Sequence, residues 1–224
     1  MSIKLRSVSK SLREKEILSR VTFDISDGEI LIIKGKDEEA KTTLLNILDG
    51  VSPISNGSIT ISGYDISEMK RKERAVFFRN TIGFVPEGTY LQPNLNVRGN
   101  LSLPGVFAGL NKRENESRIR RVSKRFGFSK ESLKQKVSVL SFADKKNLCV
   151  ARACFMNPKI ILAEKLTDEL ENENAEIIMQ KILDFAKETG ATIIIASNDN
   201  RIEQYATKVV TLKSGKIVET EEEK

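Results

Sequence analysis

The stretch Glu29-Ile30-Leu31-Ile32-Ile33-Lys34-Gly35-Lys36-Asp37-Glu38-Glu39-Ala40-Lys41-Thr42-Thr43 decides the predicted fold. Its first six residues predict a buried strand that ends at Gly35, and an amphipathic helix is expected to begin near Lys41. The turn between them fits the pattern G-x-x-x-x-[GA]-K-[ST], with Ala40 in place of the second glycine. In that pattern backbone N–H groups, a helix N-terminus and a lysine together bind phosphates. The segment therefore predicts the frame of a phosphate-binding loop.

The interior of this loop is acidic. Asp37, Glu38 and Glu39 face only two lysines, Lys36 and Lys41, which leaves the loop with a charge of about −1. Two like charges 4 Å apart repel by about 4 kcal/mol at an effective dielectric constant of about 20. Ordinary ATP binding is therefore not expected here. The alternative, that the acids turn outward and the loop still works, stays open.

The rest of the chain alternates short β-rich runs with longer helical stretches, which predicts an α/β fold. The segments Ile3–Val8 and Val21–Ile25 have the alternation of an antiparallel sheet. From about residue 90 to 139 the β signal vanishes, which indicates an inserted helical subdomain. The predicted organisation is one domain over 1–224, with a core of about 1–89 and 140–224 and a helical subdomain of about 90–139.

Composition excludes several chemistries. The 224 residues carry 37 Lys and Arg against 31 Asp and Glu, a formal charge of +6, and no histidine. Ser-His-Asp catalysis, Cys-His catalysis and His-ligated metals are therefore excluded. Cys149 and Cys154 would lie about 140° apart on a helix, so we expect two reduced, buried side chains. The apolar runs are far shorter than the ~20 residues that span a bilayer, so any membrane role should be peripheral.

The order of short motifs along the chain points to one family. After the loop come Ile82-Gly83-Phe84-Val85-Pro86-Glu87, Leu140-Ser141-Phe142-Ala143-Asp144, Ala151-Arg152-Ala153, Pro158–Thr167, Ser197-Asn198-Asp199 and Leu212–Ile217. Over nearly the whole chain this series resembles the ATP-binding subunits of ABC transporters. Asn100–Pro104 looks most like the macrolide-exporter, lipoprotein-releasing and cell-division branch. The resemblance implies a P-loop NTPase-type ABC ATPase fold with an antiparallel β subdomain and an inserted helical subdomain.

The resemblance also implies a set of candidate site residues. Those at the family's nucleotide contacts are Gly35, Lys41, Thr42, Thr43, Glu87 and Ser141. Glu87 replaces the family's glutamine, and Ser141 belongs to the signature motif. If Mg²⁺ is bound, Thr42 and Glu164 would hold it, because Glu164 stands at the family's metal-coordinating aspartate.

Several departures from the family pattern affect catalysis. Lys165 stands where the family has its catalytic glutamate, and Asn198 stands where it has its histidine. An ammonium group accepts no proton from an attacking water unless its pKa falls far, and an amide carries no charge. Phe142 and Ala143 replace the two signature glycines, and Leu12 stands nearest the missing adenine-stacking aromatic. No catalytic residue and no cofactor are therefore expected, with ATP and Mg²⁺ left only as residual ligands.

Three hypotheses follow from the sequence. The favoured one is a degenerate ATP-binding-type subunit without catalysis, at the cytoplasmic face of a membrane. It would be a structural or regulatory partner of an integral membrane subunit and would form a homo- or heterodimer with another ATP-binding subunit. The first alternative is an atypical but working export ATPase that uses Lys41, Thr42, Thr43 and Glu164. The second is a soluble interaction protein whose Arg118–Arg125 cluster touches nucleic acid, although a solvated basic face is the preferred reading and nucleic acid is not an expected partner.

Overall fold

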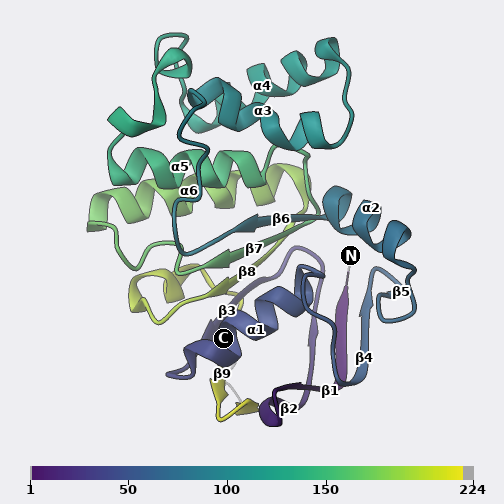
Figure 1. Ribbon diagram of the computed structural model, residues 1–224. Helices are drawn as coiled ribbons and strands as arrows, with labels where there is room; N and C mark the ends of the chain where they lie inside the picture. The colour runs from purple at the N-terminus through teal and green to yellow at the C-terminus, as the bar shows by residue number, and fades with distance from the viewer. Residues whose placement is uncertain (1, 219–224) are drawn as a thin grey trace.

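The computed structural model of the protein, which describes residues 2–218, contains two sheets and a set of covering helices (Figure 1). The strands are β1 (Ile3–Leu12), β2 (Lys15–Ile25), β3 (Ile30–Lys34), β4 (Asn56–Ile61), β5 (Tyr64–Asp65), β6 (Ile82–Val85), β7 (Ile160–Glu164), β8 (Thr192–Ala196), β9 (Lys208–Lys213) and β10 (Lys216–Val218). The α-helices are α1 (Glu38–Leu48), α2 (Arg71–Thr81), α3 (Val97–Phe107), α4 (Lys112–Phe126), α5 (Phe142–Ala153) and α6 (Asn172–Thr189). Short 3-10 helices lie at η1 (Ser132–Lys134), η2 (Val137–Val139) and η3 (Asn200–Tyr205).

The larger sheet has the strand order β10-β9-β3-β8-β7-β6, and its pairs are parallel except for the hairpin of β9 and β10. Its central strands β3, β7 and β8 are continuous apolar runs, as expected for parallel strands covered on both faces. Because parallel strands end at one edge, the residues after β3, β7 and β8 come close together. That edge holds the predicted loop.

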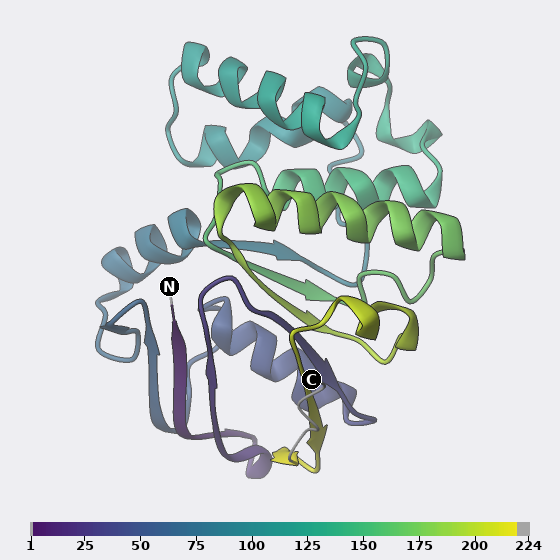
Figure 2. The same cartoon turned by 180° about the vertical axis from the view of Figure 1, so that it is seen from behind.

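The smaller sheet is antiparallel, with the order β2-β1-β4-β5. Register shifts interrupt the pairing of β1 with β2, and Ser7 and Arg20 at these irregularities have positive φ angles. Bulges of this kind bend a strand and increase its twist. The antiparallel sheet curls beside α1, opposite the main helical layer (Figures 1 and 2).

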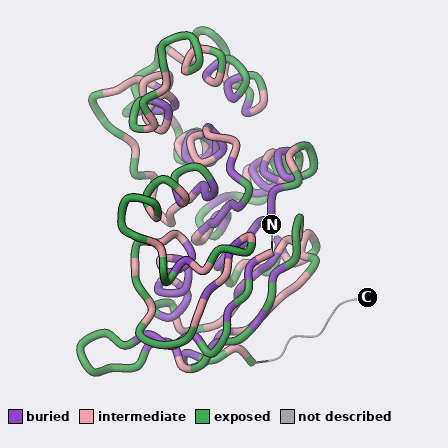
Figure 3. Tube along the Cα trace, turned by 90° about the vertical axis from the view of Figure 1, so that its right-hand side faces the viewer, coloured by how far each residue is buried: buried purple, intermediate pink, exposed green. Residues whose placement is uncertain are grey.

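Two hydrophobic cores separate along the faces of the parallel sheet. Ile32, Ile161 and Ile193 point into a core with α5 and α6, whereas Leu31 and Leu162 point into a second core with α1 and the antiparallel sheet. Helices α3 and α4 lie beyond α5, farther from the sheet, and most of their outer surface is exposed (Figures 1 and 3). The expected α/β fold with an antiparallel sheet is confirmed.

Two predicted helix starts are wrong by two or three residues. Helix α1 begins at Glu38 rather than near Lys41, because the side chain of Asp37 caps it by accepting from the N–H of Ala40. The apolar pattern predicts a helix over Asp144–Met156, but α5 begins at Phe142, because Ser141 caps it in the same way. Both starts depend on N-caps that the apolar pattern does not reveal.

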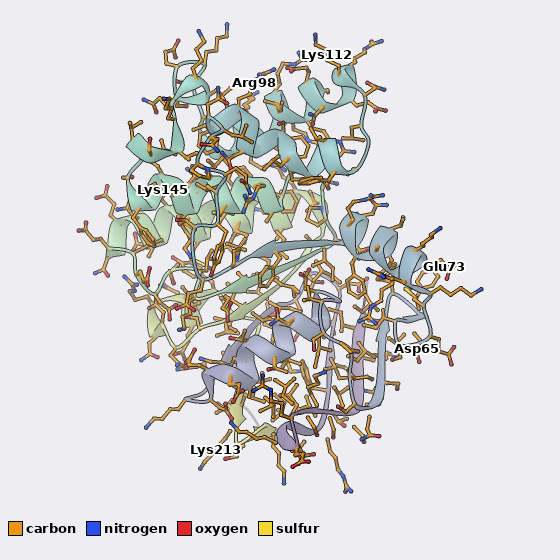
Figure 4. All side chains as sticks on the ribbon, in the orientation of Figure 1. Asp65, Glu73, Arg98, Lys112, Lys145 and Lys213 are labelled. Carbon is orange, nitrogen blue, oxygen red and sulfur yellow. The ribbon has the colours of Figure 1, made fainter. Side chains whose placement is uncertain are left out.

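The sequence predicts a basic helical segment from Lys112 to Phe126, and α4 spans those residues, with a capping box at its start and the left-handed Gly127 at its end. Its basic side chains are partly structural. Arg125 forms an ion pair with Glu188, and Arg118 donates to the carbonyl of Phe155. Lys112 points outward from the start of the helix (Figure 4). The division into a core and a helical subdomain at 90 and 139 stays a prediction.

Two other expectations concern cysteines and membrane spans. Cys149 and Cys154 are buried, free thiols, as predicted, and burial raises the pKa of both. Within residues 2–218, no helix combines the length and the apolar character needed to cross a membrane.

Candidate functional site

The predicted loop lies at the carboxyl edge of the parallel sheet, between β3 and α1. Lys41 is only 2% exposed. Gly35 is required by close approach, since a Cβ there would lie 2.0 Å from the carbonyl oxygen of Leu212. The predicted arrangement of strand, loop and helix is therefore present.

Within this arrangement, the backbone amides are already used. The N–H of Glu38 donates to Lys36 O at 3.1 Å, and the N–H of Lys41 donates to Asp37 O at 3.1 Å. The N–H of Ala40 donates to the Asp37 side chain. Helix α1 begins at Glu38, inside the loop segment, so these three donors are not available to a phosphate.

The carboxylate of Glu38 occupies the centre of the loop. Its Oε1 lies 2.8 Å from Lys41 Nζ and accepts from Asn198 Nδ2 at 3.1 Å. Its Oε2 lies 3.4 Å from Lys165 Nζ. These three partners come from α1 and from the segments that follow β7 and β8. Partial burial opposes ionisation, but Lys41 and Lys165 outweigh it and lower the pKa of Glu38, so this group is a carboxylate at neutral pH.

Lys165 and Asn198, which stand at the family's catalytic positions, both belong to this cluster. Lys165 Nζ also donates to Glu87 Oε1 at 2.9 Å, and this hydrogen bond, against weak desolvation and with help from Glu38, raises the pKa of Lys165. Asn198 accepts from the N–H of Gly35 at 2.9 Å. Lys165 is therefore an ammonium group at neutral pH and holds no lone pair with which to accept a proton.

Lys146 is a site residue that the sequence reasoning missed. It is 1% exposed, and its ammonium group donates to Glu87 O at 2.6 Å and lies near Pro86 O and Lys165 O. Burial lowers its pKa. The sequence feature that could have indicated this role is a lysine among the buried residues of α5, because a buried ammonium group needs oxygen atoms as partners. Lys146 thus ties α5 to the backbone of both Glu87 and Lys165.

The two candidate metal ligands contact each other directly, since the Thr42 hydroxyl donates to Glu164 Oε1. Thr43 is buried in α1, away from the loop surface. Ser141 caps α5 and hydrogen-bonds Asp144 Oδ2 at 2.6 Å, so it lies outside the Glu38 cluster. In the part of the chain that the structure describes, no group of three or more acidic, cysteine or histidine side chains could hold a metal ion.

A bound nucleotide does not fit the site as it stands. The lysine that would meet its phosphates is paired with Glu38, three loop amides are donated internally, and Asp37 and Glu39 add two further acids. A phosphate could reach Lys41 only by displacing the Glu38 carboxylate against like-charge repulsion. The geometry forms a closed network of ion pairs and hydrogen bonds instead.

Comparisons with known proteins all match this chain to proteins of ABC transporters. The family model described as ABC transporter matches residues 18–169. The lipoprotein-releasing system ATP-binding protein LolD of Bacteroides fragilis is 30% identical, over 96% of this chain and all of its own length. The macrolide export ATP-binding/permease protein MacB of Shewanella sp. is 32% identical, over 96% of this chain but only 33% of its own length.

Solved structures agree on the fold. A dimeric ATP-binding cassette in a post-hydrolysis state, with ADP and phosphate bound, superposes with a TM-score of 0.88 at 27% identity, over 98% of each chain. CbiO1 of Clostridium perfringens, part of the ABC transporter complex CbiONQ, also has a TM-score of 0.88, at 26% identity, over 97% of this chain and 86% of its own.

Proposed function

This chain belongs to the ABC transporter family, as one of its ATP-binding subunits, and we propose that within this family it has lost ATP hydrolysis. In this proposal it is a structural or regulatory subunit at the cytoplasmic face of a membrane, bound to an integral membrane subunit and to another ATP-binding subunit. The observation that carries the proposal is Lys165, which is held as an ammonium group by Glu87 and Glu38. It stands at the position where the family resemblance expects a general base.

Hydrolysis requires a group that takes a proton from the attacking water or orients that water. Lys165 carries a positive charge and donates to Glu87, so it cannot act as the base that takes a proton from the water. Glu87 itself is committed to this ion pair, and Asn198 is committed to Glu38 and Gly35. Lys165 and Asn198 are therefore both held by the Glu38 carboxylate.

The proposed membrane partner is supported by the relatives. In MacB the matching segment is one third of a protein named as both ATP-binding protein and permease. LolD, which this chain matches along its whole length, is named as an ATP-binding protein alone. We propose that a permease is the membrane partner of this ATP-binding chain.

An apolar groove supplies a surface for that partner. It has a volume of about 350 Å³ and is lined by Phe84, Leu103, Phe107 and Met156, with Arg79 and Arg152 among its other walls. Phe107 is 74% exposed, next to the half-exposed Val106. An apolar helix of the membrane subunit that carries an acidic residue would match this combination of apolar walls and two guanidinium groups.

The second candidate function, an atypical export ATPase, is favoured by one contact. Thr42 and Glu164 remain adjacent, as two ligands of a shared Mg²⁺ would be. Its test is the rate of Mg-ATP hydrolysis by the purified membrane complex. The proposed function predicts that Lys41→Ala in this chain leaves that rate unchanged, because any hydrolysis belongs to the other ATP-binding subunit. Loss of hydrolysis in this variant would establish the ATPase instead.

The partner is tested on the same complex. Phe107→Glu should abolish co-purification of the integral membrane subunit, because it places a charge in the groove. The matched control is Val51→Glu, since Val51 is 71% exposed and lies just after α1, outside the groove. If Phe107→Glu keeps the membrane subunit bound as well as Val51→Glu does, the groove is not the docking site.

A further inference from the structure

Glu38 is bonded in the manner of a bound anion. Its two oxygens meet the ammonium groups of Lys41 and Lys165 and the amide of Asn198, all within 3.4 Å. These donors come from three separate elements that converge at the carboxyl edge of the sheet. Such convergence of cations and amides on one point is the arrangement that binds a phosphate.

We propose that Glu38 is a built-in anion, which fills the phosphate position of the loop and holds its surroundings together without a nucleotide. This proposal rests on the proposed function and explains how a subunit without a nucleotide keeps its site ordered. It also makes the position a latent polyphosphate site, which opens when this one carboxylate is removed.

The buried lysine supports the assignment. Lys41 is 2% exposed, and a buried ammonium group without a counter-charge is strongly unfavourable. The carboxylate of Glu38, 2.8 Å away, supplies that charge from the first turn of the same helix. Lys165 has Glu87 as a second partner, so it does not depend on Glu38 alone. Loss of the Glu38 carboxylate should therefore destabilise the charge of Lys41 more than that of Lys165.

Neighbouring acids do not share this role. Glu39 points the other way and pairs with Lys15 at 2.7 Å, where both side chains are more than half exposed. The side chain of Asp37 caps the helix through Ala40. Within the loop segment 35–43, Glu38 is thus the acid that contacts both the buried Lys41 and Lys165. Glu39 is a matched control with the same charge one residue away.

The experiment measures binding of tripolyphosphate and of Mg-ATP to the purified chain by isothermal titration calorimetry, together with the shift of the thermal unfolding midpoint. For Glu38→Gln we expect binding of both ligands to be at least about tenfold tighter than in the wild type, equivalent to about 1.4 kcal/mol. The unfolding midpoint of this variant should fall without ligand and recover when tripolyphosphate is added. Glu39→Gln should behave as the wild type does.

Three results would overturn the proposal. One is wild-type binding as tight as that of Glu38→Gln, and another is an equal gain in Glu39→Gln, which would indicate only a general change of charge. The third is a Glu38→Gln variant that folds, by circular dichroism, but gains no affinity. If that variant fails to fold, Glu38→Gly replaces it. If neither variant folds, the wild-type titration decides, since a rise in its unfolding midpoint with tripolyphosphate contradicts a filled site.

This outcome is separable from that of the proposed function. Binding by the isolated chain tests the internal anion, whereas hydrolysis by the complex tests the loss of catalysis. Wild-type binding without Lys41-dependent hydrolysis would remove the inference and leave the proposed function standing.

Discussion

At the scale of single residues, Asp49 places a carboxyl group at the C-terminal end of helix α1, and its charge affects the stability of the protein. Asp49 follows the last turn of α1, and its own N–H donates to Leu45 O at 2.8 Å. A negative charge at this end opposes the helix macrodipole. Burial raises the pKa of Asp49 to about 6, so the folded protein takes up a proton at a pH where the unfolded chain does not.

Asp49→Asn should therefore stabilise the protein near neutral pH. Because the folded pKa of Asp49 is raised above the unfolded one, the wild type is least stable above pH 6 and gains stability as the pH falls from about 6 towards 4. We expect the variant to unfold with a free energy higher by about 1–2 kcal/mol at about pH 7.5. Urea unfolding at several pH values measures this.

The gain of Asp49→Asn should shrink between pH 6 and pH 4 as the wild-type carboxyl group takes up its proton. Glu68→Gln, at an exposed position before α2, serves as the control and should show no such trend. A gain that stays constant with pH would mean that burial of the Asp49 charge is not its cause.

At the scale of elements, one capping side chain decides where α1 begins, and with it the state of the loop. Asp37→Ala should lower the free energy of unfolding by about 1 kcal/mol, because the N–H of Ala40 loses its acceptor. Asp37→Ser, which keeps a capping oxygen, should restore most of this loss. Urea unfolding of both variants measures the effect. Equal stability of Asp37→Ala and the wild type would mean that the cap does not hold the helix start.

At the scale of the whole molecule, the helical layer packs on the sheet at a point where no side chain fits. A Cβ on Gly83 of β6 would lie 2.4 Å from the carbonyl oxygen of Ala153 at the end of α5. Gly83→Ala should therefore cost about 1–3 kcal/mol by forcing α5 away from the sheet. This helix carries Lys146, so the Glu87 backbone should also lose its anchor.

Gly88→Ala is the matched control for that prediction. Its Cβ would meet only the side chain of Tyr90, which is largely exposed and able to move. Thermal unfolding should separate the two variants by several degrees. If both unfold at the same temperature, the contact between β6 and α5 is not as tight as the structure shows it.

The fold could be predicted from the sequence, because apolar runs and motifs are local signals that recur along the chain. Apolar runs such as those of β3 and β8 each predict a buried strand, and the order of the motifs indicates the family whose fold the structure has. The sequence also predicts that Lys165 and Asn198 depart from the family pattern.

Which groups those residues contact could be seen only in the tertiary structure. The Glu38 carboxylate meets Lys165 and Asn198 because the segments that follow β7 and β8 reach the sheet edge where α1 begins, although both lie more than a hundred residues from Glu38 in the chain. Lys146 also has partners on other elements, since Glu87 and Lys165 follow β6 and β7 and lie 59 and 19 residues from it in the chain. Charge counts along the loop predicted repulsion, but pairing depends on distance, and distance between remote segments is a property of the packed sheet rather than of the local sequence.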